Sequence, residues 1–155
     1  MATEKQYLFF KSLHDEETAR ERQLNELARN YLSLATLYSA FVLFVLDKAR
    51  PDSSTTKVVF FAAIGCMLIW FLLSLWATKV SDYEAVNAPH RVFAEFGSVP
   101  LDDEEFFDNR IADYIVACER NTRANDLKAS RLKLAGYSLL VGITLQACYL
   151  TARGW

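Results

Sequence analysis

Three apolar blocks alternate with polar segments along this chain. The longest block, 58–77, reads VVFFAAIGCMLIWFLLSLWA and contains no charged residue. A helix of about twenty residues rises about 30 Å, which is the thickness of the hydrocarbon core of a bilayer. A buried helix of that length in a water-soluble protein normally carries a polar face. The block therefore predicts a membrane-spanning helix.

Two further blocks, 30–46 and 134–151, also lack charge and lie between charged residues. Their Ser and Thr hydroxyls can donate to backbone carbonyls of the preceding turn, so these side chains are tolerated in lipid. We expect both blocks to span the membrane as well, which gives three spans. The alternative is that these two blocks are buried helices of a water-soluble bundle.

Parts of the polar segments are expected to be helical, whereas the irregular stretch 79–101 is assigned no element. The leader, 1–29, is predicted to be a helix that runs into the first span, with Asp15 as a candidate N-cap. Within the segment 79–133, a helix is predicted from about 103, because Asp102 and Glu105 fit a capping box. That helix is expected to enter the membrane near 134 and, with the third span, to reach about fifty residues.

The composition agrees with this division into blocks. The chain has 155 residues, of which 52% are hydrophobic and 23% are charged. That length has room for one domain. The net charge of -2 disfavours a basic nucleic-acid-binding protein, so no nucleic acid is expected as a partner. We expect an all-α membrane protein with a single membrane domain over 1–155, three transmembrane helices and a helical cytoplasmic stalk.

The distribution of Lys and Arg predicts the orientation of the spans. The leader carries five of these residues and the segment 79–133 carries eight, whereas the opposite side carries four. Positive residues are enriched on the cytoplasmic side of a membrane. We therefore expect a multi-pass protein of the inner membrane, with a cytoplasmic N-terminus and a periplasmic C-terminus.

The sequence contains no recognisable catalytic constellation. We expect no catalytic residue, no cofactor-binding residue and no metal ligand, because the two histidines, His14 and His90, form no ligand pattern. No charged residue lies inside a predicted span, which argues against a proton pump or an ion-coupled transporter. A membrane enzyme that uses His90 or the acidic run 102–105 is an alternative.

Small residues recur at a spacing of four in the predicted spans, as in Ala35 with Ser39 and Ser138 with Gly142. Such ridges allow helices to pack closely, either within one chain or between copies. A homo-oligomeric ring would place polar side chains along a pore. The candidate oligomer-contact and pore-lining residues are Ser33, Thr36, Ser39, Ser138, Gly142 and Gln146.

A regular helical face precedes the third span. Its apolar residues follow the spacing i, i+4, i+7 and i+8, which is typical of one face of a helix. We interpret this face as a candidate docking surface for a cytoplasmic protein partner. Its members are Phe107, Ile111, Tyr114 and Ile115.

Two related polar patterns precede the first and third spans. They are Glu21-Arg22-Gln23-Leu24-Asn25 and Glu119-Arg120-Asn121-Thr122-Arg123-Ala124-Asn125-Asp126-Leu127-Lys128-Ala129. The second resembles the polar helix that runs directly into a span in small transmembrane effectors of bacterial anti-phage defence, of the Pycsar and SLATT types. The resemblance implies assembly that impairs the inner membrane when a partner or a signalling nucleotide reports infection. The sequence contains no recognisable nucleotide pocket, which argues against direct sensing of a nucleotide by this chain. The resemblance carries over no functional residue.

These observations lead to two functional hypotheses. The first is a non-enzymatic inner-membrane effector that oligomerises in the lipid bilayer and disrupts or permeabilises it, in anti-phage defence. The second is an accessory membrane subunit or scaffold, whose cytoplasmic helices dock a partner protein while the spans anchor it.

Overall fold

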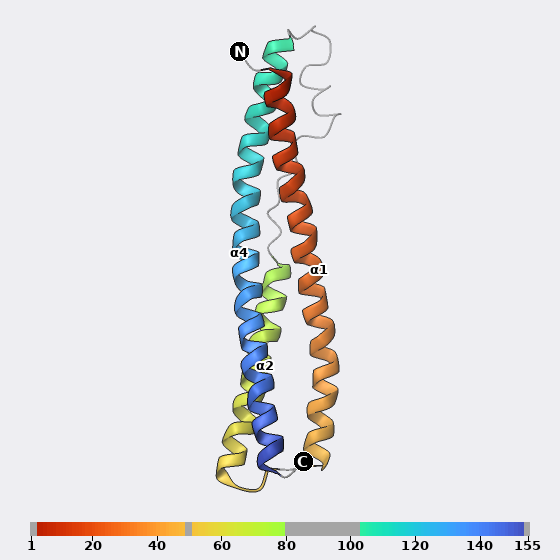
Figure 1. The fold of residues 1–155 in the computed structure, drawn as a ribbon, viewed down its shortest axis with the longest axis vertical. Helices are drawn as coiled ribbons and strands as arrows, with labels where there is room; N and C mark the ends of the chain where they lie inside the picture. The colour runs from red at the N-terminus through yellow and green to blue at the C-terminus, as the bar shows by residue number, and fades with distance from the viewer. Residues whose placement is uncertain (1–2, 49–50, 80–102, 154–155) are drawn as a thin grey trace. The chain divides into compact units, whose positions relative to one another are not determined.

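The computed structural model describes residues 3–48, 51–79 and 103–153. Almost all of these residues are helical, and no strand occurs among them. The helices are α1 (Glu4–Lys48), α2 (Ser54–Thr78) and α4 (Asp103–Ala152) (Figure 1). Each is long and apolar enough to cross a membrane. The predictions of an all-α chain and of three candidate spans are therefore confirmed.

The start of α1 differs from the prediction. The Gln6 backbone N–H faces the Thr3 hydroxyl at 3.4 Å, and the Thr3 backbone N–H donates to the Gln6 side-chain oxygen at 2.9 Å. This reciprocal pair is a capping box, so α1 begins at Glu4. Asp15 lies well inside the helix, and its interpretation as an N-cap is wrong.

The other two helices match the expected positions. The helix α4 begins at Asp103 and runs for 50 residues without interruption, as the sequence indicates. The helix α2 begins four residues before the apolar block 58–77, because Ser53 and Thr56 form its capping box. The stretch 80–101 and the predicted Asp102 cap lie outside the described residues.

The chain forms two compact units. The first unit contains 1–23 and 80–126, and the second contains 24–79 and 127–155. The described part of the second unit comprises the apolar half of α1, all of α2 and the apolar half of α4. We describe each unit separately.

In the second unit, buried positions of α2 and α4 recur at spacings of three, four or seven residues. This spacing is typical of helices that pack with a shallow left-handed crossing. In α2 the buried residues are Phe60, Ala63, Met67, Trp70, Ser74 and Ala77. In α4 the buried residues of this unit are Lys128, Leu132, Ala135, Gly142, Gln146 and Tyr149.

Three apolar clusters hold this unit together. One joins Ala28, Ala77 and Leu132, with Tyr31 beside it. The next is built on Ala35, Met67, Trp70 and Ala135. The third joins Val45, Phe60 and Tyr149. Since lipid is as apolar as these side chains, close packing and hydrogen bonds rather than the hydrophobic effect hold such helices together.

The first unit is a helix pair with mixed aromatic and polar contacts. The Tyr7 ring lies 5.6 Å from the Phe107 ring and 5.8 Å from the Tyr114 ring, between centroids. The His14 ring lies 5.5 Å from the Tyr114 ring. Aromatic pairs at these distances add stability beyond the area that they bury.

Candidate functional site

The helices α2 and α4 are closely joined at the middle of their apolar stretches. The Ser138 hydroxyl donates to the Cys66 backbone carbonyl at 2.7 Å. A Cβ atom on Gly142 would lie 3.3 Å from the Met67 thioether sulfur, so the backbones approach closely at this point. Ser138 and Gly142 therefore contribute to packing within one chain, and a role for them between copies stays a prediction.

A second contact joins α2 and α4 at the end of α2. The Arg131 guanidinium donates to the Trp76 backbone carbonyl at 3.0 Å. The same group lies over the Trp76 ring, 4.1 Å from its centroid. Cation–π contacts of this kind are stabilising at partly exposed sites. Sequence reasoning missed this pair, although an Arg and a Trp that flank two spans on the same side are a recognisable signal.

The apolar half of α1 is packed much more loosely than α2 and α4. In the most apolar 18-residue stretch of each helix, 11% of the residues are buried in α1, against 28% in α2 and 22% in α4. A groove of about 570 Å³ lies between α1 and α2, where Ala35, Thr36 and Ser39 face Met67 and Phe71 across it.

A second groove lies on the other side of α1. It has a volume of about 300 Å³, and Leu37 and Phe41 of α1 line it together with Leu139 and Ile143 of α4. Open space on two sides means that fewer side-chain contacts fix α1 than fix the α2–α4 pair. The spanning half of α1 is therefore the weakly held element of this unit.

The three hydroxyl residues predicted to line a pore lie on this weakly held helix. Ser33, Thr36 and Ser39 are all exposed on α1. The Ser39 hydroxyl donates to the Ala35 carbonyl at 2.8 Å, and the Thr36 hydroxyl faces the Leu32 carbonyl at 3.4 Å. These hydroxyls are thus satisfied within their own helix, which allows them to face lipid.

Gln146 occupies a different environment. Its side chain is only 2% exposed. Among the described residues, neither its amide nitrogen nor its amide oxygen has a hydrogen-bond partner. Burying an amide without a partner in an apolar surrounding is costly. Of the candidate residues in the spans, Gln146 alone is a buried polar group left unsatisfied by its neighbours in the described structure.

The two polar patterns that carry the family resemblance make contacts near the ends of the spans. In the second unit, the Lys128 ammonium donates to the Asn25 side-chain oxygen at 2.8 Å, and Lys128 is 2% exposed. A polar residue at a buried position of a helix pair fixes the register of that pair. The two polar patterns contain both residues, but the pairing between them was not predicted from the sequence.

Related contacts occur in the first unit. The Asn125 amide donates to the Glu17 carboxylate at 2.7 Å and to the Glu17 backbone carbonyl at 3.0 Å. The Arg20 guanidinium donates to the Asp126 carboxylate at 2.6 Å, which raises the pKa of Arg20. These bonds hold two polar helix segments side by side without a large apolar core.

The predicted docking face is only partly available. Phe107 and Tyr114 contact Tyr7 within the first unit. Burial, followed by the hydrogen bond with Tyr7, raises the pKa of Tyr114 to about 12, so its hydroxyl is neutral at physiological pH. Ile111 is half-buried, whereas Ile115 is 44% exposed. A docking role for these four residues stays a prediction.

No group of three or more His, Cys, Asp or Glu side chains that could hold a metal ion occurs within 3–48, 51–79 and 103–153. Burial and the nearby Glu17 charge raise the pKa of the Cys118 thiol. A raised pKa lowers the thiolate fraction and with it the reactivity of the thiol. Cys118 is therefore a poor nucleophile in this environment.

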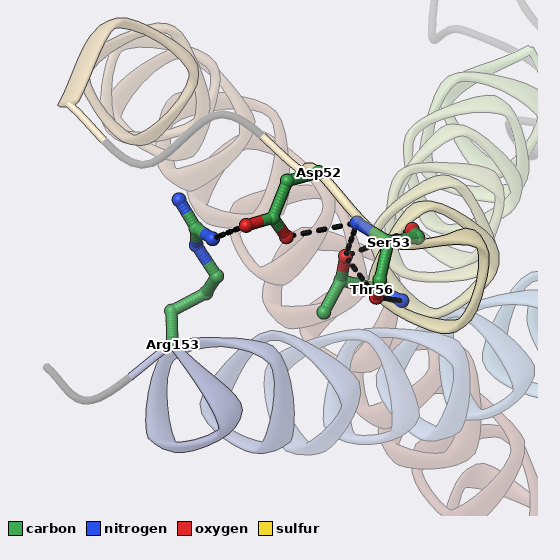
Figure 2. Close-up of polar contacts among 4 residues, drawn as sticks. All are labelled: Asp52, Ser53, Thr56 and Arg153. Carbon is green, nitrogen blue, oxygen red and sulfur yellow. Dashed lines mark hydrogen bonds and ion pairs between the residues drawn. The ribbon is translucent and has the colours of Figure 1, made fainter.

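A polar network closes the other end of the spanning helices (Figure 2). The Ser53 backbone N–H donates to the Asp52 carboxylate at 2.8 Å, and the Thr56 backbone N–H donates to the Ser53 hydroxyl at 3.2 Å. The Arg153 guanidinium pairs with the other oxygen of Asp52. The Ser53 N–H and then Arg153 hold the pKa of Asp52 below its ordinary value.

The lowered pKa of Asp52 predicts an acid-sensitive contact. An aspartate with a lowered pKa stabilises the folded state above the unfolded-state pKa of about 3.9, and this contribution is lost as the pH falls further. We expect the thermal stability of the wild type to fall more steeply from pH 5 to pH 3 than that of Asp52→Asn or Arg153→Gln. The effect should be small because Asp52 is exposed, and identical pH profiles for all three proteins would contradict it.

Comparisons with known proteins identify no relative of this chain. No protein-family model, no curated protein sequence and no solved structure matches it. The proposals below therefore depend on the residues and contacts described above.

Proposed function

We propose that this chain is a non-enzymatic, multi-pass protein of the bacterial inner membrane that self-assembles and permeabilises the membrane in anti-phage defence. In this proposal, the N-terminus and 79–133 are cytoplasmic and the C-terminus is periplasmic. The activating signal comes from a partner protein or a signalling nucleotide. The observation that carries the proposal is the difference in packing between α1 and the α2–α4 pair.

The packing difference supports self-assembly for a physical reason. A spanning helix gains nothing by hiding apolar side chains from lipid, so it associates where small residues allow close approach. Ala35, Thr36 and Ser39 supply such a surface on α1, and in one chain this surface borders an open groove. A helix from another copy can fill this space with more contacts than a mobile lipid chain makes.

The same residues support permeabilisation. The hydroxyls of Thr36 and Ser39 lie on the exposed side of α1 and accompany Ser33 along the helix. In an assembled ring, these hydroxyls can exchange the carbonyl of their own helix for water and so line a narrow polar path. No charged side chain is needed for such a path, which agrees with the absence of charge from 30–46.

Induced expression tests this proposal. We expect loss of membrane potential before lysis when the full chain is expressed in bacteria together with its genomic neighbours. Ser39→Leu should reduce the rate of depolarisation at least tenfold, because leucine fills the groove and removes a hydroxyl. Thr144→Leu is the matched control, since Thr144 is exposed on α4 and its hydroxyl bonds to the Leu140 carbonyl at 2.9 Å. Unchanged potential and dye uptake during strong wild-type expression would refute the proposal.

The second candidate is a scaffold that docks a separate enzyme. It is favoured by the exposed apolar residues Ile115 and Val116 in the first unit, which are 44% and 46% exposed. Under this alternative, Ile115→Asp removes a stable co-purifying partner, and the wild type causes no change in membrane conductance.

A further inference from the structure

The buried amide of Gln146 is the least satisfied polar group of the spanning segments. It lies on α4 one turn after Gly142, which contacts Met67, and one turn before Tyr149, which packs with Val45 and Phe60. The surroundings of Gly142 and of Tyr149 are both apolar. Gln146 is 2% exposed, and no described residue accepts from or donates to it.

Two other polar side chains of α2 and α4 avoid this cost by bonding to a backbone carbonyl. The Ser74 hydroxyl donates to the Trp70 carbonyl at 2.8 Å, although Ser74 is fully buried. The Thr144 hydroxyl donates to the Leu140 carbonyl in the same way. Gln146 makes no such bond, so the interior of a single chain leaves its amide unpaired.

Both α1 and α2 border this region of α4, and α1 is the more weakly held of the two. Val45 of α1 packs with Tyr149, and Phe41 lines the groove that Ile143 borders, so α1 lies beside α4 on either side of the Gln146 level. Moving the spanning half of α1 away from α4 separates the α1 residues of the three apolar clusters, but the open grooves leave fewer contacts to break there than between α2 and α4. The same movement opens the α1 side of α4 at the position of Gln146.

We propose that the described bundle is the resting form of the chain, and that Gln146 pairs with Gln146 of a second copy after the spanning half of α1 moves away from α4. A primary amide carries both donors and an acceptor, so two identical amides are complementary to each other. Hydrogen bonds between polar side chains hold spanning helices together in lipid. This inference rests on the proposed self-assembly and names the residue that drives it.

The inference predicts opposite effects of one substitution on the single chain and on the assembly. In Gln146→Leu, the unpaired amide is gone, so the single chain in detergent should unfold at a higher temperature than the wild type. The same variant should self-associate at least tenfold more weakly in lipid nanodiscs, measured by native mass spectrometry over a range of protein-to-lipid ratios. Gln146→Asn, which keeps an amide, should retain part of the association.

Thr144→Val is the matched control, because it removes an exposed polar group from the same helix and should associate as the wild type does. Equal association of Gln146→Leu and the wild type would overturn this inference while leaving the proposed assembly in place. A Gln146→Leu protein that unfolds more readily than the wild type would overturn it as well. A wild type that is monomeric at every protein-to-lipid ratio, in cells and in nanodiscs, would overturn both proposals.

Discussion

Replacing Gly142 by leucine should separate α2 from α4. A Cβ atom at this position already lies 3.3 Å from Met67 and 3.4 Å from the Cβ of Cys66, so a larger side chain has no space. Overpacking of a close contact costs about 1–3 kcal/mol. It should also lengthen the bond from the Ser138 hydroxyl to the Cys66 carbonyl, which lies one turn away. We expect a clear fall in the melting temperature of the purified protein in detergent.

Gly65 provides a control for this experiment. A Cβ atom on Gly65 would meet nothing within 4 Å, so Gly65→Leu should leave the melting temperature nearly unchanged. If the two leucine variants melt at the same temperature, the close approach of α2 and α4 at Gly142 is wrong.

Replacing Lys128 by methionine should cause the second large loss of stability. Lys128 is almost fully buried, and its ammonium donates to the Asn25 oxygen at 2.8 Å. Methionine keeps the length of the side chain but leaves the half-buried Asn25 oxygen without this charged donor. The loss of a hydrogen bond to a charged group costs about 1.5–3 kcal/mol.

Two comparisons test the origin of this loss. Lys133→Met changes an exposed lysine of the same helix and should have little effect. Combining Lys128→Met with Asn25→Leu should recover part of the stability, because the Asn25 oxygen that loses its Lys128 donor is then removed as well. Strictly additive losses in the double variant would show that Asn25 and Lys128 do not stabilise each other.

Most helix positions in this protein can be predicted from the sequence. Charge-free blocks give the three spans, and the absence of Pro and Gly between Leu101 and Ala135 gives the uninterrupted α4. The start of α1 could also have been read from Thr3 and Gln6, since Thr-x-x-Gln is a capping-box pattern. Asp15 was predicted as the N-cap instead, because it lies closer to the region of paired charges.

The contacts of the candidate site are harder to predict from the sequence, because small residues occur in every span. Ser39 and Ser138 each belong to a pair of small residues four positions apart, yet Ser138 bonds across to Cys66 and Ser39 bonds only within α1. Which ridge is used inside the chain depends on the packing of three helices at once. Periodicity along a single helix does not contain that information.

The environment of Trp70 gives the protein an optical signal of its own. The indole is 1% exposed, and its N–H has no acceptor among the described residues. Indole emission moves to longer wavelength when mobile dipoles surround the ring, so a dry and unpartnered Trp70 emits at the short-wavelength edge. Trp70 borders both grooves beside α1, and its emission therefore changes when that helix departs or water enters. With Trp76 and Trp155 replaced by phenylalanine, the fluorescence of Trp70 can follow opening in real time without an attached dye.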